Sequence, residues 1–114
     1  MEIIDQSSTE LTRAQLYVLT RSQARQSLAK ADVETIKLNA WCHYMDVNSN
    51  GNEVELLSLL DDNGSVYNTN SKYFIRDFMD MIDFFAEDGV HEISVIHQIS
   101  KKNQREFITC SYLS

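Results

Sequence analysis

Features that would indicate a membrane protein are missing from this sequence of 114 residues. It contains no apolar run approaching the roughly twenty residues that a membrane-spanning helix needs. Residues 1–10 are polar and acidic, unlike the basic and then apolar layout of a signal peptide. We therefore expect a protein that stays in the cytoplasm of its own cell or of a host cell, without a membrane partner.

Cysteine and histidine are too few and too scattered to predict a metal site. The two cysteines, Cys42 and Cys110, form no Cys-x-x-Cys motif, and the three histidines lack the spacing of metal ligands. Both cysteines lie in apolar, strand-like stretches, which in a cytoplasmic protein favours buried thiols over a disulfide. We expect neither a metal nor any other cofactor.

Signatures of catalysis are also missing. The sequence has no glycine-rich phosphate loop, no Gly-x-Ser-x-Gly motif and no conspicuous spacing of histidine, carboxylate and nucleophile. Residues 46–51 (DVNSNG) begin like a calcium-binding EF-hand loop, but Leu57 occupies the position where that loop requires a glutamate. We interpret this stretch as a turn and predict that the protein is not an enzyme.

The charge of the chain is acidic in sum but uneven along the sequence. Acidic residues outnumber basic ones by 17 to 10, which gives a net charge of −7 and by itself argues against binding to phosphates. Residues 11–31 nevertheless contain basic residues and no acid, residues 101–105 are basic, and the acids gather in residues 77–92. This segregation leaves room for a basic surface that contacts nucleic acid.

Hydrophobic periodicity predicts a mainly β fold with helices. We divide the chain into a flexible tail (1–10), an N-terminal helical segment (11–32) and a β-barrel domain (33–114). In that domain we expect strands over residues 35–45, 53–60, 66–69, 92–100 and 106–113, and a helix over about 71–86. Five strands with a helix between the third and fourth is the order of the OB-fold, a barrel that binds oligonucleotides.

Two stretches, residues 69–78 (TNSKYFIRDF) and 106–110 (EFITC), resemble single-stranded DNA-binding proteins carried by phages and plasmids of Gram-positive bacteria. The hairpin at residues 46–51 and the strand start at residues 55–58 (ELLS) are similar too. The resemblance implies an OB-fold, a role in phage or plasmid DNA replication or transfer, and a place in the bacterial host cytoplasm. Residues 108–114 read as a strand, so partner recruitment by a disordered acidic tail, as in housekeeping relatives, is not expected.

The candidate binding residues come first from the strand predicted at residues 35–45. Its core face is predicted to consist of alternate residues, namely Ile36, Leu38, Ala40, Cys42 and Tyr44. Trp41 and His43 then share the outer face with Lys37, where an aromatic ring beside basic groups makes a platform for stacking bases. The alternative is that the N-terminal helix packs over Trp41, since that helix has to dock somewhere.

The other candidates lie on later and earlier segments. Tyr67, on the short third strand, either stacks on a base or fills the barrel. Lys101, Lys102 and Arg105 are expected to grip phosphates from a hairpin loop, and Arg21 and Arg25 to extend that track. Tyr73 and Phe107 are expected to be buried rather than exposed.

Two functions remain open from the sequence. The first is sequence-tolerant binding of single-stranded DNA, with replication proteins as further partners. The second is an acidic protein-interaction module that mimics DNA or inhibits a host protein, which the acids of residues 77–92 suggest. The oligomeric state stays open, because edge strands and the N-terminal helix are both able to pair with a second copy.

Overall fold

A computed structural model describes residues 1–7 and 10–113 of the chain, and residues 8, 9 and 114 of the predicted tail and barrel lie outside the described residues. The elements follow in the order β1 (Glu2–Gln6), α1 (Arg13–Thr20), β2 (Gln26–Ser27), β3 (Thr35–Val47), β4 (Glu53–Asp61), β5 (Val66–Thr69), α2 (Lys72–Phe84), β6 (Glu92–Ile99) and β7 (Glu106–Leu113). The predicted mainly β fold with helices is confirmed.

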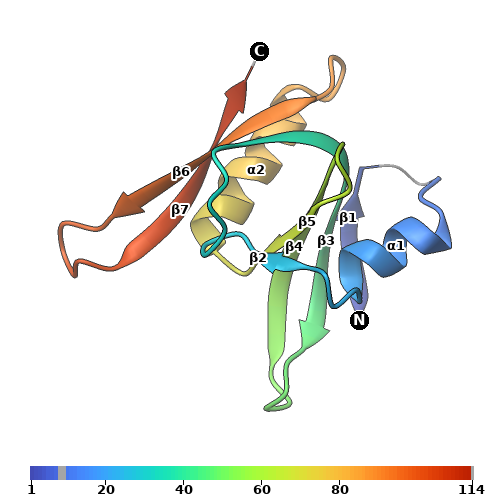
Figure 1. Ribbon diagram of the computed structural model, residues 1–114, viewed down its shortest axis with the longest axis horizontal. Helices are drawn as coiled ribbons and strands as arrows, with labels where there is room; N and C mark the ends of the chain where they lie inside the picture. The colour runs from blue at the N-terminus through green and yellow to red at the C-terminus, as the bar shows by residue number, and fades with distance from the viewer. Residues whose placement is uncertain (8–9, 114) are drawn as a thin grey trace.

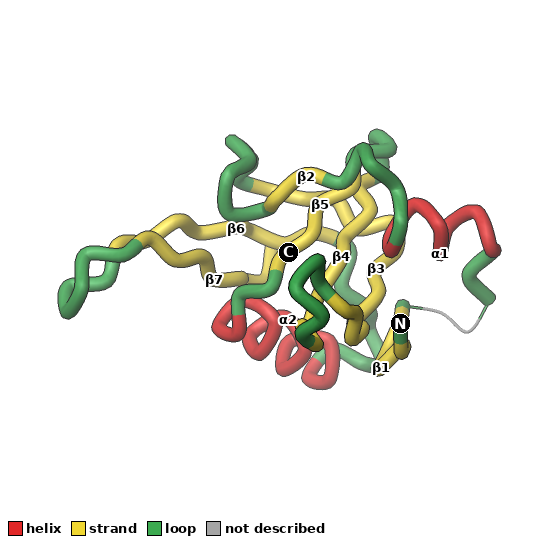
Figure 2. Tube along the Cα trace, turned by 90° about the horizontal axis from the view of Figure 1, so that it is seen from below, coloured by secondary structure: helices red, strands yellow, loops and turns green. Residues whose placement is uncertain are grey.

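All the described strands belong to one curled sheet, shaped like half a barrel (Figure 1). The order is β2-β5-β4-β3-β6-β7, and β1 also pairs with β3. The long strand β3 holds the sheet together because it pairs with β4 on one side and, on the other, with β6 near its start and β1 near its end. Figure 2 shows α1 and α2 on different sides of this sheet.

The predicted alternation of β3 fails at one position. The register between β3 and β4 shifts between Leu38 and Ala40, which marks a β-bulge at Asn39. A bulge adds one residue to a strand, so residues before and after it that differ in parity come to lie on the same face. Ile36 and Trp41 accordingly share one core cluster. The prediction that Ile36 and Tyr44 share a single core face is therefore wrong.

Both faces of the sheet carry a hydrophobic core. The larger cluster contains Trp41, Leu57 and Tyr67 and is covered by α2, whose Phe74 and Phe78 are fully buried. The predicted apolar stripe of α2 is thus confirmed, and Ser71 caps the helix through a hydrogen bond from the Phe74 amide. The smaller cluster lies on the opposite face and is made by residues of β3 and α1, namely Leu19, Ala40, Cys42 and Tyr44.

The N-terminal helix is shorter than predicted, because α1 ends at Thr20 and not near residue 30. Leu19 is buried in the smaller cluster and Leu28 in the larger one. Nine positions at about 100° each place these two leucines on opposite sides of a continuous helix. A straight helix is unable to bury both in their separate clusters, so the chain turns after Thr20 and continues through β2.

The prediction of a flexible tail at residues 1–10 is also wrong for most of that segment. Glu2–Gln6 form strand β1, which pairs antiparallel with the second half of β3. Ser7 extends this contact, since its hydroxyl accepts a hydrogen bond from the Trp41 amide at 3.0 Å. The sequence did not predict this strand because Ile3 and Ile4 are adjacent and place an apolar side chain on each face. The alternation of apolar and polar residues that indicates a strand is therefore missing.

Candidate nucleic-acid interface

The hairpin of β6 and β7 extends well beyond the rest of the molecule. Only residues Glu92–Ser94 of β6 pair with β3. The distal part of the hairpin, residues 96–106, projects away from the curled sheet in two views at right angles, and we call it the arm (Figures 1 and 2). A projecting two-stranded ribbon of this kind offers its two faces and its tip to a ligand.

The turn at the end of the arm has a defined conformation. The Ser100 amide donates to the Arg105 carbonyl at 2.9 Å, and the Gln104 amide donates to the Ser100 carbonyl at 2.8 Å. The Arg105 amide donates to Asn103 Oδ1 at 3.1 Å, and Gln104 adopts a φ of 56°. This turn presents the exposed residues Lys101, Lys102 and Arg105 at the tip, as the sequence predicted for a hairpin loop.

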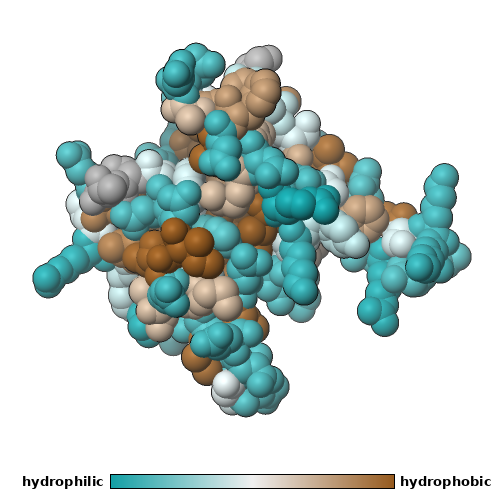
Figure 3. All heavy atoms as spheres, turned by 180° about the vertical axis from the view of Figure 1, so that it is seen from behind, coloured by the Kyte–Doolittle hydropathy of each residue, from teal (hydrophilic) through white to brown (hydrophobic). Residues whose placement is uncertain are grey.

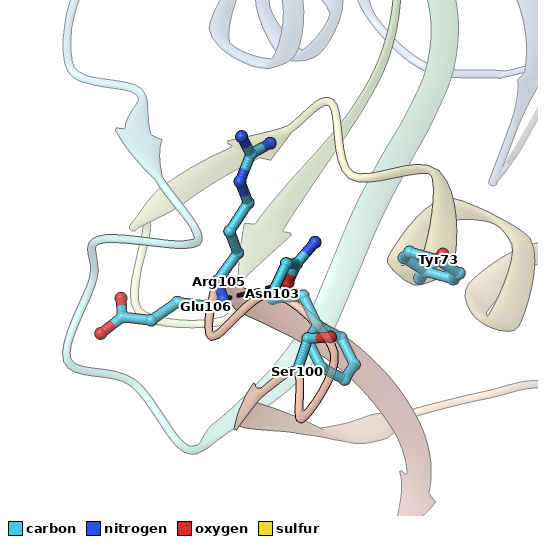
Figure 4. A pocket seen from close by; sticks show the side chains of 6 residues that line it. Tyr73, Ser100, Asn103, Arg105 and Glu106 are labelled. Carbon is cyan, nitrogen blue, oxygen red and sulfur yellow. Dashed lines mark hydrogen bonds between the residues drawn. The ribbon is translucent and has the colours of Figure 1, made fainter.

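A groove of about 430 Å³ separates the arm from the first turn of α2. It is lined by Tyr73, Ser100, Asn103, Arg105, Glu106 and Phe107. Figure 4 shows Tyr73 facing the arm from α2, with Asn103 and Arg105 on the turn opposite. Glu106 and Phe107 are consecutive in β7, so their side chains project from opposite faces of the strand. Glu106 borders the groove, and Figure 4 shows its side chain pointing away from Tyr73.

Tyr73 is the most exposed aromatic side chain of this groove, with 56% of its surface accessible. Its ring lies 5.9 Å from that of Phe107, tilted by 56°, and the Arg76 guanidinium lies 5.4 Å from its centre. The prediction that Tyr73 is buried is wrong. Helical geometry contains the missed signal, because Tyr73 lies about 100° away from the stripe that runs through Phe74 and Phe78.

Basic side chains lie on both elements that border the groove. Lys72 and Arg76 come from the start of α2, and Lys101, Lys102 and Arg105 from the arm, all of them exposed. The Arg76 Nη2 atom forms an ion pair with Asp77 Oδ1 at 3.5 Å. Within the described residues, Asp77 is the one carboxylate that pairs with any of these five basic side chains. The sequence did not single out Lys72 and Arg76, because the folding of the chain alone brings them opposite residues 101–105.

Trp41 does not form the exposed stacking platform predicted for β3. Only 6% of its surface is accessible, and its ring meets that of Phe78 edge to face at 5.5 Å and 79°. The helix that covers it is α2, whereas the alternative weighed from the sequence was the N-terminal helix. The bulge at Asn39 explains this outcome, since it turns Trp41 toward the concave side where α2 lies.

Tyr67 and His43 are buried as well, each with 8% of its surface accessible. Tyr67 fills the cluster that contains Trp41, which agrees with the barrel-filling alternative. The His43 Nε2 atom lies 2.9 Å from Glu55 Oε2, so its imidazole is engaged inside the protein. The side chains of Tyr67 and His43 are therefore not presented to a ligand in this conformation.

The remaining predicted residues are dispersed. Lys37 and Arg21 are exposed, but neither lines the groove. Arg25 is half-buried and donates from Nη1 to the Tyr44 hydroxyl at 3.0 Å, which anchors the segment after α1 to β3. Of the nine predicted binding residues, only Arg105 lines the groove, and Lys101 and Lys102 lie beside it on the same turn.

The two thiols are free, as predicted, with Cys42 buried and Cys110 half-buried. Burial raises the pKa of Cys42 to about 11, with a smaller contribution from Asp5. It raises the pKa of Cys110 to about 12, with a smaller contribution from Asp77. Thiols held neutral in this way are poor nucleophiles, because the thiolate is the reactive form.

Comparison of the chain with protein-family profiles, curated proteins and solved structures finds no match. Within residues 1–7 and 10–113, no helix is long and apolar enough to cross a membrane. In the same part of the chain, no group of His, Cys, Asp and Glu is arranged to hold a metal ion.

Proposed function

We propose that this protein binds single-stranded DNA without strong sequence preference, through the groove between α2 and the arm. The observation that carries the proposal is an aromatic pair, the exposed Tyr73 and the half-buried Phe107, with basic residues on both elements that form it. Proteins that bind single strands combine such rings, on which bases stack, with a basic track for the backbone.

The proposal includes an OB-fold for strands β3–β7. Their order in the sheet, β5-β4-β3-β6-β7, with α2 between β5 and β6 in sequence, supports it. In that fold the loop between the last two strands is one of the two loops that contact an oligonucleotide. Here it is the turn that carries Lys101, Lys102 and Arg105.

The groove has dimensions and chemistry suited to an unpaired base. Its volume of about 430 Å³ falls within the roughly 300–1,000 Å³ of small-molecule sites. A base stacked on Tyr73 gains roughly 1–3 kcal/mol, and its phosphates then lie near Arg105 and the arm lysines. A paired base is unable to leave its helix without losing stacking energy, which favours single strands over duplex.

The acidic remainder of the molecule limits contact to this region. The chain carries a net charge of −7 even though the start of α2 and the turn of the arm together carry five exposed cations. Like charges repel, so a phosphate backbone is disfavoured elsewhere on the surface. We further propose a role in phage or plasmid DNA replication or transfer in the bacterial cytoplasm, with replication proteins as partners and without catalysis, as the family resemblance implies.

The test is fluorescence anisotropy of labelled oligo-dT at low and moderate salt, with a duplex of equal length as the control ligand. We expect binding to oligo-dT that weakens as salt rises, because counterions are released. Tyr73→Ala should weaken it about 5- to 150-fold, the equivalent of one lost stacking contact. Tyr17→Ala is the matched control, since Tyr17 is 60% exposed on α1, away from the groove.

Two results would contradict the proposal. Absence of oligo-dT binding at every salt concentration would refute single-strand binding and favour the acidic interaction module, for which the exposed Asp80 and Asp83 of α2 are candidate contacts. Equal losses in Tyr73→Ala and Tyr17→Ala would place the DNA on another surface of the protein.

A further inference from the structure

Apolar side chains continue along the arm after the core has ended. Ile93 and Val95 of β6 are buried, whereas Ile99, on the same face of the strand, has 66% of its surface exposed. It is the last residue of β6 and directly precedes the basic turn. Figure 3 shows apolar atoms on the stem of the arm, next to its hydrophilic end.

A second hairpin in the molecule provides a contrast. Val47, at the end of β3, is 57% exposed beside the turn that leads to β4. Val47 pairs with Glu53 across the two strands, as Ile99 pairs with Glu106, but the turn after Val47, residues 48–52, contains no basic residue. Lys101, Lys102 and Arg105 attract a phosphate backbone to the arm, and the turn after Val47 has no such group. Only one of these two exposed apolar residues is therefore placed to meet DNA.

Resting on the proposed function, we propose that the arm recognises junctions between single-stranded and duplex DNA, with Ile99 packed against the terminal base pair. The last base pair of a duplex exposes an apolar face to water. Minor-groove proteins insert isoleucine and similar side chains between base steps, and at a duplex end the face of a base pair is accessible without unstacking. The tip of the arm supplies such a side chain, with basic groups within a few residues of it.

The residue opposite Ile99 supports contact with a base and not with the backbone. Glu106 pairs with Ile99 across the hairpin, and its exposed carboxylate repels a phosphate at that position. An uncharged base pair carries no such penalty. The single strand that leaves the junction would then enter the adjacent groove, which Tyr73, Glu106 and Phe107 line together.

The experiment compares three labelled ligands by anisotropy: a duplex with a single-stranded dT tail, the tail alone, and the blunt duplex. We expect the tailed duplex to bind about tenfold more tightly than the tail alone, as burial of one aliphatic side chain predicts. A fluorescent adenine analogue in the terminal base pair should change its emission when the protein binds. Both effects should disappear in Ile99→Ser, while its affinity for the tail alone stays unchanged.

Val47→Ser is the matched control and should keep the junction preference, and thermal melting should confirm that both variants are folded. Equal binding of tail and tailed duplex by the unmodified protein would overturn the inference while leaving single-strand binding intact. Retention of the preference in Ile99→Ser would overturn it as well. If Ile99→Ser instead converts a dimer to a monomer in sedimentation, without altering junction binding, Ile99 serves contact with a second copy. Loss of all DNA binding in the unmodified protein would refute the proposed function itself.

Discussion

Replacement of Trp41 distinguishes a structural from a DNA-binding role for this residue, because the two roles predict opposite patterns of loss. Trp41 is 6% exposed and packs edge to face on Phe78, so Trp41→Ala leaves a cavity between β3 and α2. Truncation of a buried tryptophan costs roughly 3–5 kcal/mol. With a slope of about 2 kcal/mol per molar urea, the unfolding midpoint should fall by about 2 M. The free energy of unfolding of a domain of this size is roughly 5–15 kcal/mol, so Trp41→Ala is able to unfold the protein. Trp41→Phe, which removes less volume, is therefore the companion variant.

The assay uses the fact that Trp41 is the only tryptophan of the chain. Its emission should be that of a buried indole, and oligo-dT should leave it nearly unchanged while anisotropy reports binding. Trp41→Phe should lower the urea midpoint but keep the affinity for oligo-dT in the folded state. Strong quenching by oligo-dT, or an affinity loss of about 5- to 150-fold in a variant of unchanged stability, would refute the buried placement of this ring.

Three further outcomes are expected. Gln104→Gly should raise the free energy of unfolding by up to about 1 kcal/mol in urea denaturation, because Gln104 has a φ of 56° where glycine is unstrained; a loss of stability would contradict the described turn. Tyr44→Phe should cost roughly 1–3 kcal/mol, since the buried Tyr44 hydroxyl lies 3.0 Å from Ser58 Oγ and its removal leaves that group without this partner; an unchanged melting temperature would argue against the contact. The pKa values of Cys42 and Cys110 are raised from 9.0 to about 11 and about 12, chiefly by burial, so the unfolded chain releases these protons first and stability should decline as pH rises from about 9 toward 12; a double alanine variant should lose this part of the decline.

The sequence was sufficient to predict the order of the strands from residue 35 onward and the position of α2. These elements have strong local signals, such as the five-residue apolar stripe of α2 and the Asn-Gly turns between strands. The basic loop at residues 101–105 was also predictable, because it depends only on composition and on the hairpin. Elements that are determined by local sequence patterns were therefore predicted correctly.

The errors share one physical origin, which is contact between distant segments. The bulge at Asn39 reverses which side chains face α2, and no residue near it has a distinctive bulge signature. The strand β1 forms because β3 has a free edge beyond its pairing with β6. Tyr73 is exposed near the arm although its immediate neighbours are buried. Each of these facts depends on tertiary pairing that one sequence does not reveal.

The arrangement around β3 also has a consequence for synthesis of the protein. While the chain leaves the ribosome, β1, β4 and β5 are available to β3 early, but β6 emerges only after α2. Until then the first residues of β3, Thr35–Lys37, lack the strand that covers their edge in the finished sheet. Unpaired strand edges are sites of aggregation, so the nascent chain passes through a vulnerable stage that ends when β6 and β7 are complete. Ribosome-bound chains arrested before residue 92 should therefore depend on chaperones more than the released protein does.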